Sequence, residues 1–352
     1  MKQIRMFLFY GMMIAALVLA VQSVAGAKTR FMMNHQFPED TAGSKLDQWF
    51  ADEVAKATEG EVEIKIWWSN TLGAAKENLK LLSTGVIDMA AMSSGYFPSE
   101  LPFFSAPNSL PMSLDDICQS GALMKAFMTQ IPEFSEEAKR NHIRPLFFHL
   151  LNPYLLVSKK PVEKFEDLKG LQIRIWGEDM PRLVQAAGGK PVNLFLPDIY
   201  RAMESDVLDA CPFSPDMAVS YKIYELAKHV TEVVLWEGPS WGVWISEKAW
   251  EKISPEHQKR IMELSDQILE KELISTREAE TSARDFLQKQ GVTFHSFPPA
   301  DLEKWKQASP DFFADWIKKM EALGKGDAAR QTVTLWKEIR NTVSCGNNAS
   351  TP

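Results

Sequence analysis

The residue of this chain with the clearest chemical potential is Arg174. It lies in an apolar alternating run bounded by Gly170 and Gly177, a pattern that predicts a short buried strand. A guanidinium in such a strand is costly to bury unless an anion meets it. The sequence leaves two sources open for that anion: a nearby protein acid, such as Glu178 or Asp179, or the carboxylate of a ligand.

The other reactive residue types form no convincing catalytic or metal-binding set. The chain has no H-E-x-x-H, Walker or G-x-G-x-x-G motif, and its six histidines are scattered. His35 stands near Glu39 and Asp40, so a cation that bridges a ligand there is an alternative to the favoured expectation of no cofactor and no metal. The three cysteines lack metal or redox spacing, although one disulfide could form. They are Cys118, Cys211 and Cys345.

The N-terminus has the three parts of a cleavable secretory signal peptide. Two basic residues, Lys2 and Arg5, precede an uncharged apolar run over 6–21 and an A-x-A site that ends at Ala27. We expect cleavage after Ala27 and a periplasmic location. The formal charge of the chain is −7 and becomes more negative without these two basic residues, which argues against a nucleic-acid partner.

The elements that must position Arg174 form two α/β units, because 352 residues exceed one small core. In the first unit, strands are expected at 30–34, 62–67 and 86–92, and helices at 41–58 and 74–84. This alternation predicts a mostly parallel sheet, in which ligands bind beyond the carboxyl ends of the strands.

The second unit begins near His149 and repeats the pattern. The Trp-rich segment from Val230 to Ile245 is expected to be a strand that leads back to the first unit. Ser254 and Pro255 then cap and start a long helix to about Gln290, roughly 50 Å at 1.5 Å per residue, which could span both lobes. The remaining expected elements are strands at 154–157, 171–176, 191–194 and 207–210, and helices at 181–187, 197–205, 300–323 and 328–342.

Several motifs occur in a connected order along the chain. The second unit contains D-L-K-G-L-x-I-R at 167–174, A-A-G-G-x-P-V at 186–192 and Y-x-A-M-E-S-x-V-L-D-A at 200–210. The segments 82–90 and 250–256 agree with the same order. Together they resemble the DctP-type solute-binding proteins of TRAP (tripartite ATP-independent periplasmic) transporters, over residues 28 to about 300.

This resemblance implies a two-lobe periplasmic-binding-protein fold, with hinge strands and a long helix that crosses both lobes. It also implies capture of a small organic acid, whose carboxylate pairs with an arginine at the position of Arg174, and delivery to a membrane permease. That role suits arginine, because its planar fork matches a carboxylate and stays charged when it is desolvated.

The sequence departs from the family after Ala210. Many members carry an amide or acid there, whereas this chain has Cys211 to Pro215, in which Phe213 could pack on an apolar ligand and Ser214 could donate a hydrogen bond. A second arginine that is frequent in the family near Asn152 is also absent. We therefore expect a monocarboxylate with an apolar or lightly polar remainder.

The candidate ligand-binding residues follow the ends of the expected strands or are aromatic residues that could wall a cleft. For each of them taken alone, apart from Arg174 and Phe213, ordinary packing is at least an equal alternative. They are Arg174, Trp176, Phe213, Ser214, Asn34, His35, Phe37, Ser94, Tyr96, Asn152, Tyr154, Trp236 and Trp241.

The sequence thus predicts a binding subunit rather than an enzyme, with a secreted two-lobe enzyme acting on a small acid, or the binding subunit of a sensor, as alternatives. The expected partners are a small organic acid and TRAP permease subunits, and the C-terminal helices could form a homodimer face. The expected organisation is signal peptide 1–27, lobe I 28–150 plus about 238–253, lobe II 151–237, the long helix and C-terminal helices 254–344, and a mobile tail 345–352.

Overall fold

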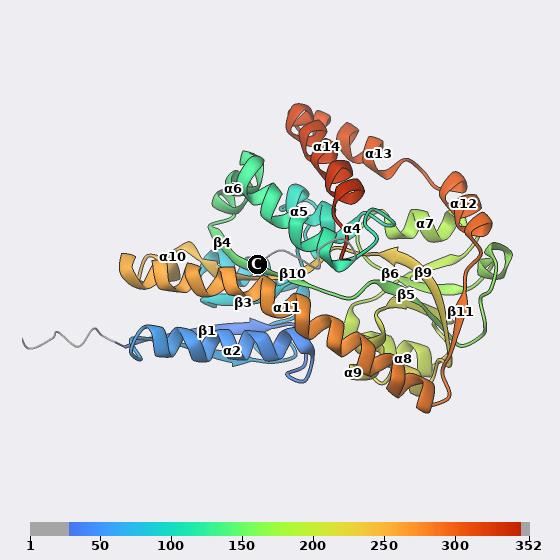
Figure 1. The fold of residues 1–352 in the computed structure, drawn as a ribbon. Helices are drawn as coiled ribbons and strands as arrows, with labels where there is room; N and C mark the ends of the chain where they lie inside the picture. Colours follow the sequence, from blue (N-terminus) through green and yellow to red (C-terminus); the bar gives the residue numbers. More distant parts are fainter. Residues whose placement is uncertain (1–27, 346–352) are drawn as a thin grey trace, which may run out of the picture.

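The computed structural model describes residues 28–345, which form two α/β lobes, each built around its own sheet (Figure 1). The expected fold class, two lobes joined by crossing strands and a long helix, is confirmed. The expected signal peptide, 1–27, lies outside the described residues, as do residues 346–352 of the expected tail. None of the helices in the described part of the chain is long and apolar enough to cross a membrane.

The sheet of lobe I has the strand order β2-β1-β3-β10-β4. β1 runs parallel to β2 and β3, whereas β10 is antiparallel to β3 and β4. The parallel strands therefore end at the same edge, where the chain continues from His35 and Met92 into loops. The strands are β1 (Thr29–His35), β2 (Val62–Trp67), β3 (Met89–Met92), β4 (Ile143–Leu150) and β10 (Pro239–Ser246).

Helices cover both faces of this sheet. Thr41 caps α2 (Ala42–Ala57) by accepting a hydrogen bond from the Ser44 N–H, and Gly85 ends α3 (Asn78–Thr84) with φ +75°, as the sequence predicts. A further layer consists of α4 (Pro102–Ser109), α5 (Ile117–Gln130) and α6 (Pro132–Arg140). Buried Glu137 of α6 accepts hydrogen bonds from the Phe103 and Phe104 N–H groups and so fixes the start of α4.

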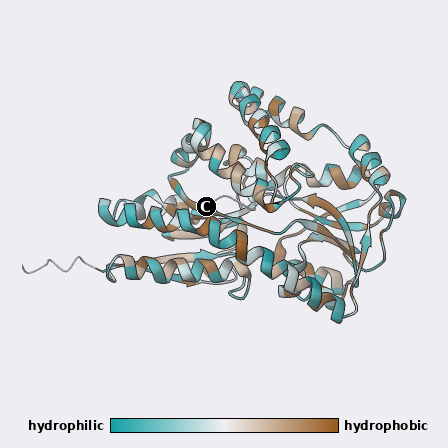
Figure 2. Cartoon of the chain, viewed as in Figure 1, coloured by the Kyte–Doolittle hydropathy of each residue, from teal (hydrophilic) through white to brown (hydrophobic). Residues whose placement is uncertain are grey.

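The sheet of lobe II has the order β11-β9-β5-β8-β6-β7. Figure 2 shows hydrophobic residues along these strands and hydrophilic residues on much of the long helix that passes in front of them. β11, at the edge, pairs in parallel with β9 and was not expected from the sequence. The strands are β5 (Tyr154–Ser158), β6 (Gln172–Ile175), β7 (Lys190–Asn193), β8 (Ala210–Phe213), β9 (His229–Trp236) and β11 (Thr293–Ser296).

The chain crosses twice between the sheets. β4 of lobe I continues into β5 of lobe II through residues 151–153, and β9 returns to β10 through Glu237 and Gly238. The single strand expected from Val230 to Ile245 is therefore two strands in different sheets. A Cβ on Gly238 would lie 2.5 Å from the Pro107 carbonyl oxygen, so the backbones approach too closely at this crossing for a larger residue.

The long helix α11 (Pro255–Lys289) is the third connection between the lobes. Ser254 caps it by accepting from the His257 N–H, as expected. The helix packs against α2 of lobe I and against α9 (Pro215–Ser220) of lobe II, and Figure 1 shows it running diagonally along both.

The predicted strand at 207–210 is wrong by three residues. Val207 is 45% exposed and lies in a turn after α8 (Ile199–Glu204), whereas the strand is β8, at 210–213. Asp206 has φ +57° and reverses the chain there. The segment expected as a loop, Cys211 to Pro215, is consequently a buried strand and the first residue of α9.

The C-terminal segment returns from lobe II to lobe I. The helix expected at 300–323 is split into α12 (Pro299–Ala308) and α13 (Phe312–Ala322), because Pro310 lacks an N–H and disfavours the helical conformation of the residue before it. The Trp305 indole donates to the Leu183 carbonyl oxygen on lobe II, and the Trp316 indole donates to the Pro102 carbonyl oxygen on lobe I.

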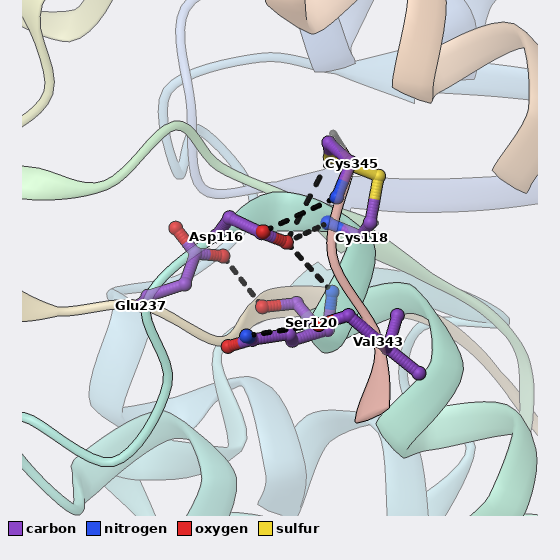
Figure 3. Close-up of a disulfide and its surroundings, with 7 residues drawn as sticks. Asp116, Cys118, Ser120, Glu237, Val343 and Cys345 are labelled. Atoms are coloured by element: carbon purple, nitrogen blue, oxygen red, sulfur yellow. Dashed lines mark hydrogen bonds between the residues drawn. A yellow bond between two sulfur atoms is a disulfide. The ribbon is translucent and has the colours of Figure 1, made fainter. Parts of the chain in front are cut away.

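A disulfide fastens the end of α14 (Gly326–Thr342) to α5. It joins Cys345 to Cys118 across 227 residues of sequence, and Figure 3 shows it above the start of α5. Cys345, the first residue of the expected tail, is thus held in place. Two residues further along α5, the Ser120 hydroxyl donates to buried Glu237 at the strand crossing, 2.5 Å away.

Candidate ligand-binding site

A narrow cavity of about 20 Å³ lies where the two lobes meet, much smaller than the roughly 300–1,000 Å³ of ordinary small-molecule pockets, so a ligand enters it only when the lobes move apart. Its lobe I side follows the carboxyl ends of β1 and β3 and the end of α4, as expected for an α/β sheet. Its lobe II side comes from β5, β6 and β9 and the segments that follow β6 and β7. The lining residues are Gln36, Phe37, Ser93, Tyr96, Asn108, Tyr154, Arg174, Trp176, Leu196 and Trp236.

Arg174 reaches this cavity from β6 and is 2% exposed. Its Nε donates to the Leu194 carbonyl oxygen at 3.1 Å, and its guanidinium lies 4.5 Å from the centre of the Trp176 ring. These two contacts fix the plane of the guanidinium. The guanidinium also hydrogen-bonds to the Tyr96 hydroxyl, and the remaining N–H groups of its terminal nitrogens are those available to a ligand.

Neither neighbouring acid neutralises Arg174. Asp179 pairs with Arg182 at 3.2 Å, and Glu178 pairs with Lys319 of α13. Among residues 28–345, no carboxylate lies within ion-pairing distance of Arg174. The alternative of an internal ion pair with Glu178 or Asp179 is therefore contradicted.

Two tryptophans of lobe II, Trp176 and Trp236, line the cavity. The Trp176 indole N–H donates to the Asn108 carbonyl oxygen at 2.9 Å, and the Trp236 indole N–H donates to the Pro107 carbonyl oxygen at 3.2 Å. Both bonds run from lobe II to the end of α4 in lobe I, so the lobes are in contact around the cavity. Because both N–H groups are used, these side chains offer a ligand mainly apolar surface.

Two tyrosines add hydroxyl groups to the lining. Burial raises the pKa of Tyr96 and of Tyr154, and the positive charge of Arg174 only partly opposes this effect. Both phenols therefore stay protonated at neutral pH and can donate hydrogen bonds to an anion. Tyr96 of lobe I also packs edge-on against Phe195 of lobe II, with ring centres 4.9 Å apart.

Polar side chains of lobe I form a bonded group beside the cavity. The Ser93 N–H donates to Gln36 Oε1 at 2.9 Å, and the Ser93 hydroxyl donates to Asn108 Oδ1 at 2.8 Å. Asn108 Nδ2 in turn donates to the Pro239 carbonyl oxygen at 3.2 Å. These bonds fix the side chains of Gln36 and Asn108 before any ligand enters.

Six of the sequence-predicted residues thus line the cavity: Phe37, Tyr96, Tyr154, Arg174, Trp176 and Trp236. Ser93, which follows the same strand end as Ser94 and Tyr96 and is a candidate by the same rule, also lines the cavity. Gln36, Asn108 and Leu196 were not predicted. Gln36 adjoins a predicted residue at a strand end, so the rule that ligands bind beyond strand ends could have found it. Asn108 could not be found in this way, because α4 contains Pro107 and is apolar around most of its circumference.

Three predicted polar residues of lobe I do not line the cavity. Their side chains instead form hydrogen bonds with backbone groups or buried side chains behind it. Asn34 Nδ2 donates to the Gly73 carbonyl oxygen at 3.0 Å, and the Ser94 hydroxyl donates to the Phe104 carbonyl oxygen at 2.7 Å. His35 points to the interior, where its Nε2 meets Asp47. Its Nδ1 accepts from the Phe37 N–H, so neither ring nitrogen is available to a bridging cation.

The predicted residue Asn152 of the first crossing and the predicted residues at β8 also lie behind the cavity wall. Asn152 Nδ2 donates to Asp216 and to the Thr276 carbonyl oxygen of α11. Phe213 is fully buried against Tyr154, and Ser214 is buried at the start of α9. Both residues occupy the core because β8 is a central strand of its sheet, not a loop.

Trp241 lies behind the cavity wall, in contact with Phe37. Its ring lies 4.2 Å from that of Phe37, which lines the cavity, and is stacked on His149 at 4.3 Å. Gly43 of α2 allows this packing, because a Cβ there would lie 2.4 Å from the Trp241 ring. Trp241 is therefore a support for Phe37 rather than a lining residue.

Four fully buried ionisable side chains form a network under this wall. Asp47 of α2 lies 2.6 Å from His35 Nε2 and 2.7 Å from His149 Nε2, and His149 Nδ1 lies 2.5 Å from Glu272 of α11. Burial disfavours charge on His149, but the two carboxylates outweigh it and raise its pKa to about 10. A protonated His149 thus connects lobe I to the long helix.

One pentapeptide, Gly238 to Gly242, has the form G-x-S-x-G of hydrolase nucleophile elbows. That motif works on a sharp turn between a strand and a helix, which exposes the serine. Here the segment enters β10, which continues to Ser246. The structural context of a nucleophile elbow is not found at this segment.

Comparison with known proteins agrees with this architecture. Residues 33–319 match the sequence profile of bacterial extracellular solute-binding protein family 7, DctP. A solute-binding protein of Albidiferax ferrireducens is 23% identical over 86% of this chain and 91% of its own length. The sialic acid-binding periplasmic protein SiaP of Vibrio cholerae is 21% identical over 86% of this chain and 93% of its own length.

Solved structures share the fold. An extracytoplasmic solute receptor of Bordetella pertussis that binds pyroglutamic acid superimposes with a TM-score of 0.78 and 21% identity, over 88% of this chain and 99% of that one. A TRAP periplasmic solute-binding protein of Chromohalobacter salexigens with bound D-glucuronate also gives 0.78, with 18% identity and the same coverage.

Proposed function

The chain belongs to family 7 of the bacterial extracellular solute-binding proteins, the DctP family, and from that premise we propose that it is the receptor subunit of a TRAP transporter. In this proposal it captures a small organic acid in the periplasm and delivers it to membrane permease subunits. No cofactor or metal takes part. The observation that carries the proposal is the buried guanidinium of Arg174, which faces the cavity between the lobes without a protein carboxylate.

The charge of the cavity favours a monocarboxylate. Among the described residues that line it, Arg174 alone carries a charge. A ligand with one carboxylate would neutralise that charge, whereas a second carboxylate would be buried without a cation. The similar Bordetella and Chromohalobacter proteins bind pyroglutamic acid and D-glucuronate, each of which has one carboxylate.

The remaining lining suits a small ligand body. Tyr96 and Tyr154 supply neutral hydroxyl donors, and Phe37, Trp176 and Trp236 supply flat apolar surface. The ligand would therefore be clamped at its acid group and held elsewhere by ring faces and a few hydrogen bonds.

Binding would close the lobes around the two strand crossings. Arg174 and Trp176 belong to lobe II, and Phe37 and Tyr96 to lobe I, so a bound acid would contact both. Because these contacts form only when the lobes approach, the ligand would favour the closed state by its differential affinity for the two states.

The test starts with mass spectrometry of small acids carried through purification, followed by titration calorimetry with the acid that is found. Arg174→Ala should weaken binding by roughly 2–5 kcal/mol, the usual cost of removing one partner of a buried charged pair. Arg201→Ala, at an exposed position of the same lobe, should leave the affinity unchanged. An Arg174→Ala variant that folds and binds the acid normally would refute the proposed role of Arg174.

A further inference from the structure

The side chain of Gln36 offers the cavity a hydrogen-bond donor that has no partner in the protein, whereas its oxygen is already bonded. Its Oε1 accepts the Ser93 N–H at 2.9 Å. A backbone N–H must meet an oxygen, so this bond settles which end of the amide is which. The NH₂ group is then the free end, and within residues 28–345 its nitrogen has no hydrogen-bond acceptor.

The position of Gln36 is fixed as firmly as its orientation. Its backbone N–H donates to the Ala91 carbonyl oxygen of β3 at 3.2 Å, and its carbonyl oxygen accepts from Asn70 Nδ2 at 3.3 Å. The residue is 4% exposed and lines the cavity. Its free NH₂ nitrogen is not among the fully enclosed polar atoms of the described residues that lack a partner, so the cavity is where this group can find one.

Gln36 and Arg174 approach the cavity from opposite lobes. Gln36 follows β1 of lobe I and Arg174 lies in β6 of lobe II. Arg174 has donors alone, and the unpaired group of Gln36 is its NH₂ donor, since its oxygen already accepts the Ser93 N–H. A ligand that satisfies both needs an acceptor at two separate places, one of them its carboxylate.

We propose that Gln36 selects the second functional group of the ligand. In this inference, which rests on the proposed function, the substrate is a monocarboxylate that carries a neutral acceptor oxygen, such as a carbonyl, which accepts from Gln36 Nε2. An ammonium group at the same place is rejected, because it would face the amide NH₂ donor to donor. The ligand class is thus narrowed from organic acids to oxo- or amide-substituted monoacids rather than amino acids.

The test compares matched acids by titration calorimetry. One series is 2-oxobutanoate, butanoate and 2-aminobutanoate, and the second is pyroglutamate and cyclopentanecarboxylate. The unmodified protein should bind the member with the carbonyl oxygen about tenfold more tightly than its unsubstituted counterpart, in keeping with one hydrogen bond to a buried donor. It should bind 2-aminobutanoate more weakly than 2-oxobutanoate.

Gln36→Met keeps the length of the side chain and removes the donor. It should abolish the preference within each series and leave the affinity for the unsubstituted acid within about threefold. Gln185→Met, at an exposed position of α7 (Met180–Ala186), is the matched control and should keep the preference. Thermal melting of each variant verifies that it is folded.

The outcomes separate this inference from the proposed function. Equal binding within each series, a preference that survives Gln36→Met, or a variant that weakens both members equally would overturn the inference while acid binding stands. The last of these results would mean that Gln36 contacts the carboxylate itself. If neither series and no acid carried through purification binds, the proposed function fails, and this inference falls with it.

Discussion

At the scale of single residues, the site depends on which acidic side chains pair with which basic side chains near Arg174. The sequence predicts that Arg174 is buried in a strand, but Glu178 and Asp179 stand close enough in sequence to pair with it. The structure sends Glu178 to Lys319 and Asp179 to Arg182. The pair of Asp179 with Arg182 is local, at a spacing of three residues. The pair of Glu178 with Lys319 joins residues 141 apart and depends on where α13 packs, so no local pattern could show it.

His149 gives the clearest pH-dependent prediction for a single residue. Its pKa is raised to about 10 in the folded protein by Asp47 and Glu272, against the effect of burial, whereas the unfolded value is near 6.5. A histidine whose pKa is higher in the folded than in the unfolded protein stabilises the fold. This stabilisation is complete at a pH below the unfolded-state pKa and is lost as the pH rises through the folded-state pKa. The stabilisation by His149 should therefore decline from about pH 6.5 to about pH 10.

The measurement compares the unmodified protein with His149→Gln by urea denaturation at several pH values. At pH 6 the variant should lose roughly 3–5 kcal/mol, because it leaves two buried carboxylates without their cation. The difference between the two proteins should shrink toward pH 10. His257→Gln, at a partly buried position of α11 beside exposed Glu61, is the control. A difference for His149→Gln that stays constant across this range would contradict the prediction.

At the scale of elements, the strand crossings and α11 decide how the lobes can move. The sequence predicts α11 almost to its last residue, because Ser254 and Pro255 signal its start and its apolar spacing continues to the end. The division of residues 230–245 into β9 and β10 was missed, because both halves are apolar. The sequence does carry a signal for it: Gly238 is followed by Pro239, and a Gly-Pro pair marks a turn or a break in a strand.

Gly238→Ala tests this crossing. A Cβ there would lie 2.5 Å from the backbone oxygen of Pro107, which cannot move without displacing α4. The substitution should lower the free energy of unfolding by about 1–3 kcal/mol, the usual cost of overpacking, and should weaken ligand binding because Pro107 also holds Trp236. Chemical denaturation and calorimetry provide the two measurements.

Gly60→Ala is the control for the crossing. Gly60 has φ +81° but nothing lies within 4 Å of an added Cβ, so this substitution introduces only backbone strain, about 1 kcal/mol. It should leave ligand affinity unchanged. If Gly238→Ala proves no more costly than Gly60→Ala and binds ligand normally, the crossing has more room than the structure indicates.

At the scale of the whole molecule, the C-terminal segment ties the lobes together. α12 packs on lobe II and α13 and α14 on lobe I, and the disulfide of Cys118 with Cys345 completes the connection. The bond closes a loop of 227 residues, and cross-links that close long loops restrict the unfolded chain most. Such a bond suits a protein exported to an oxidising compartment.

The disulfide predicts a specific pattern among serine variants. Cys118→Ser, Cys345→Ser and the double variant should each lose about 2–5 kcal/mol in unfolding free energy, and the double variant should lose no more than either single one. Thiol titration of the unmodified protein under denaturing conditions should find one free thiol, that of buried Cys211. Additive losses, or three free thiols, would contradict the bond.

The sequence by itself determined the α/β lobes, the long helix and the buried Arg174, because these depend on local periodicity, caps and the order of motifs along the chain. Only the tertiary structure decided which side chains share the cavity. It turned His35 inward to Asp47, moved Phe213 into a central strand and brought Gln36 and Asn108 to the lining. The physical reason is that the face a side chain presents, and the partner that satisfies it, are set by elements far apart in the sequence.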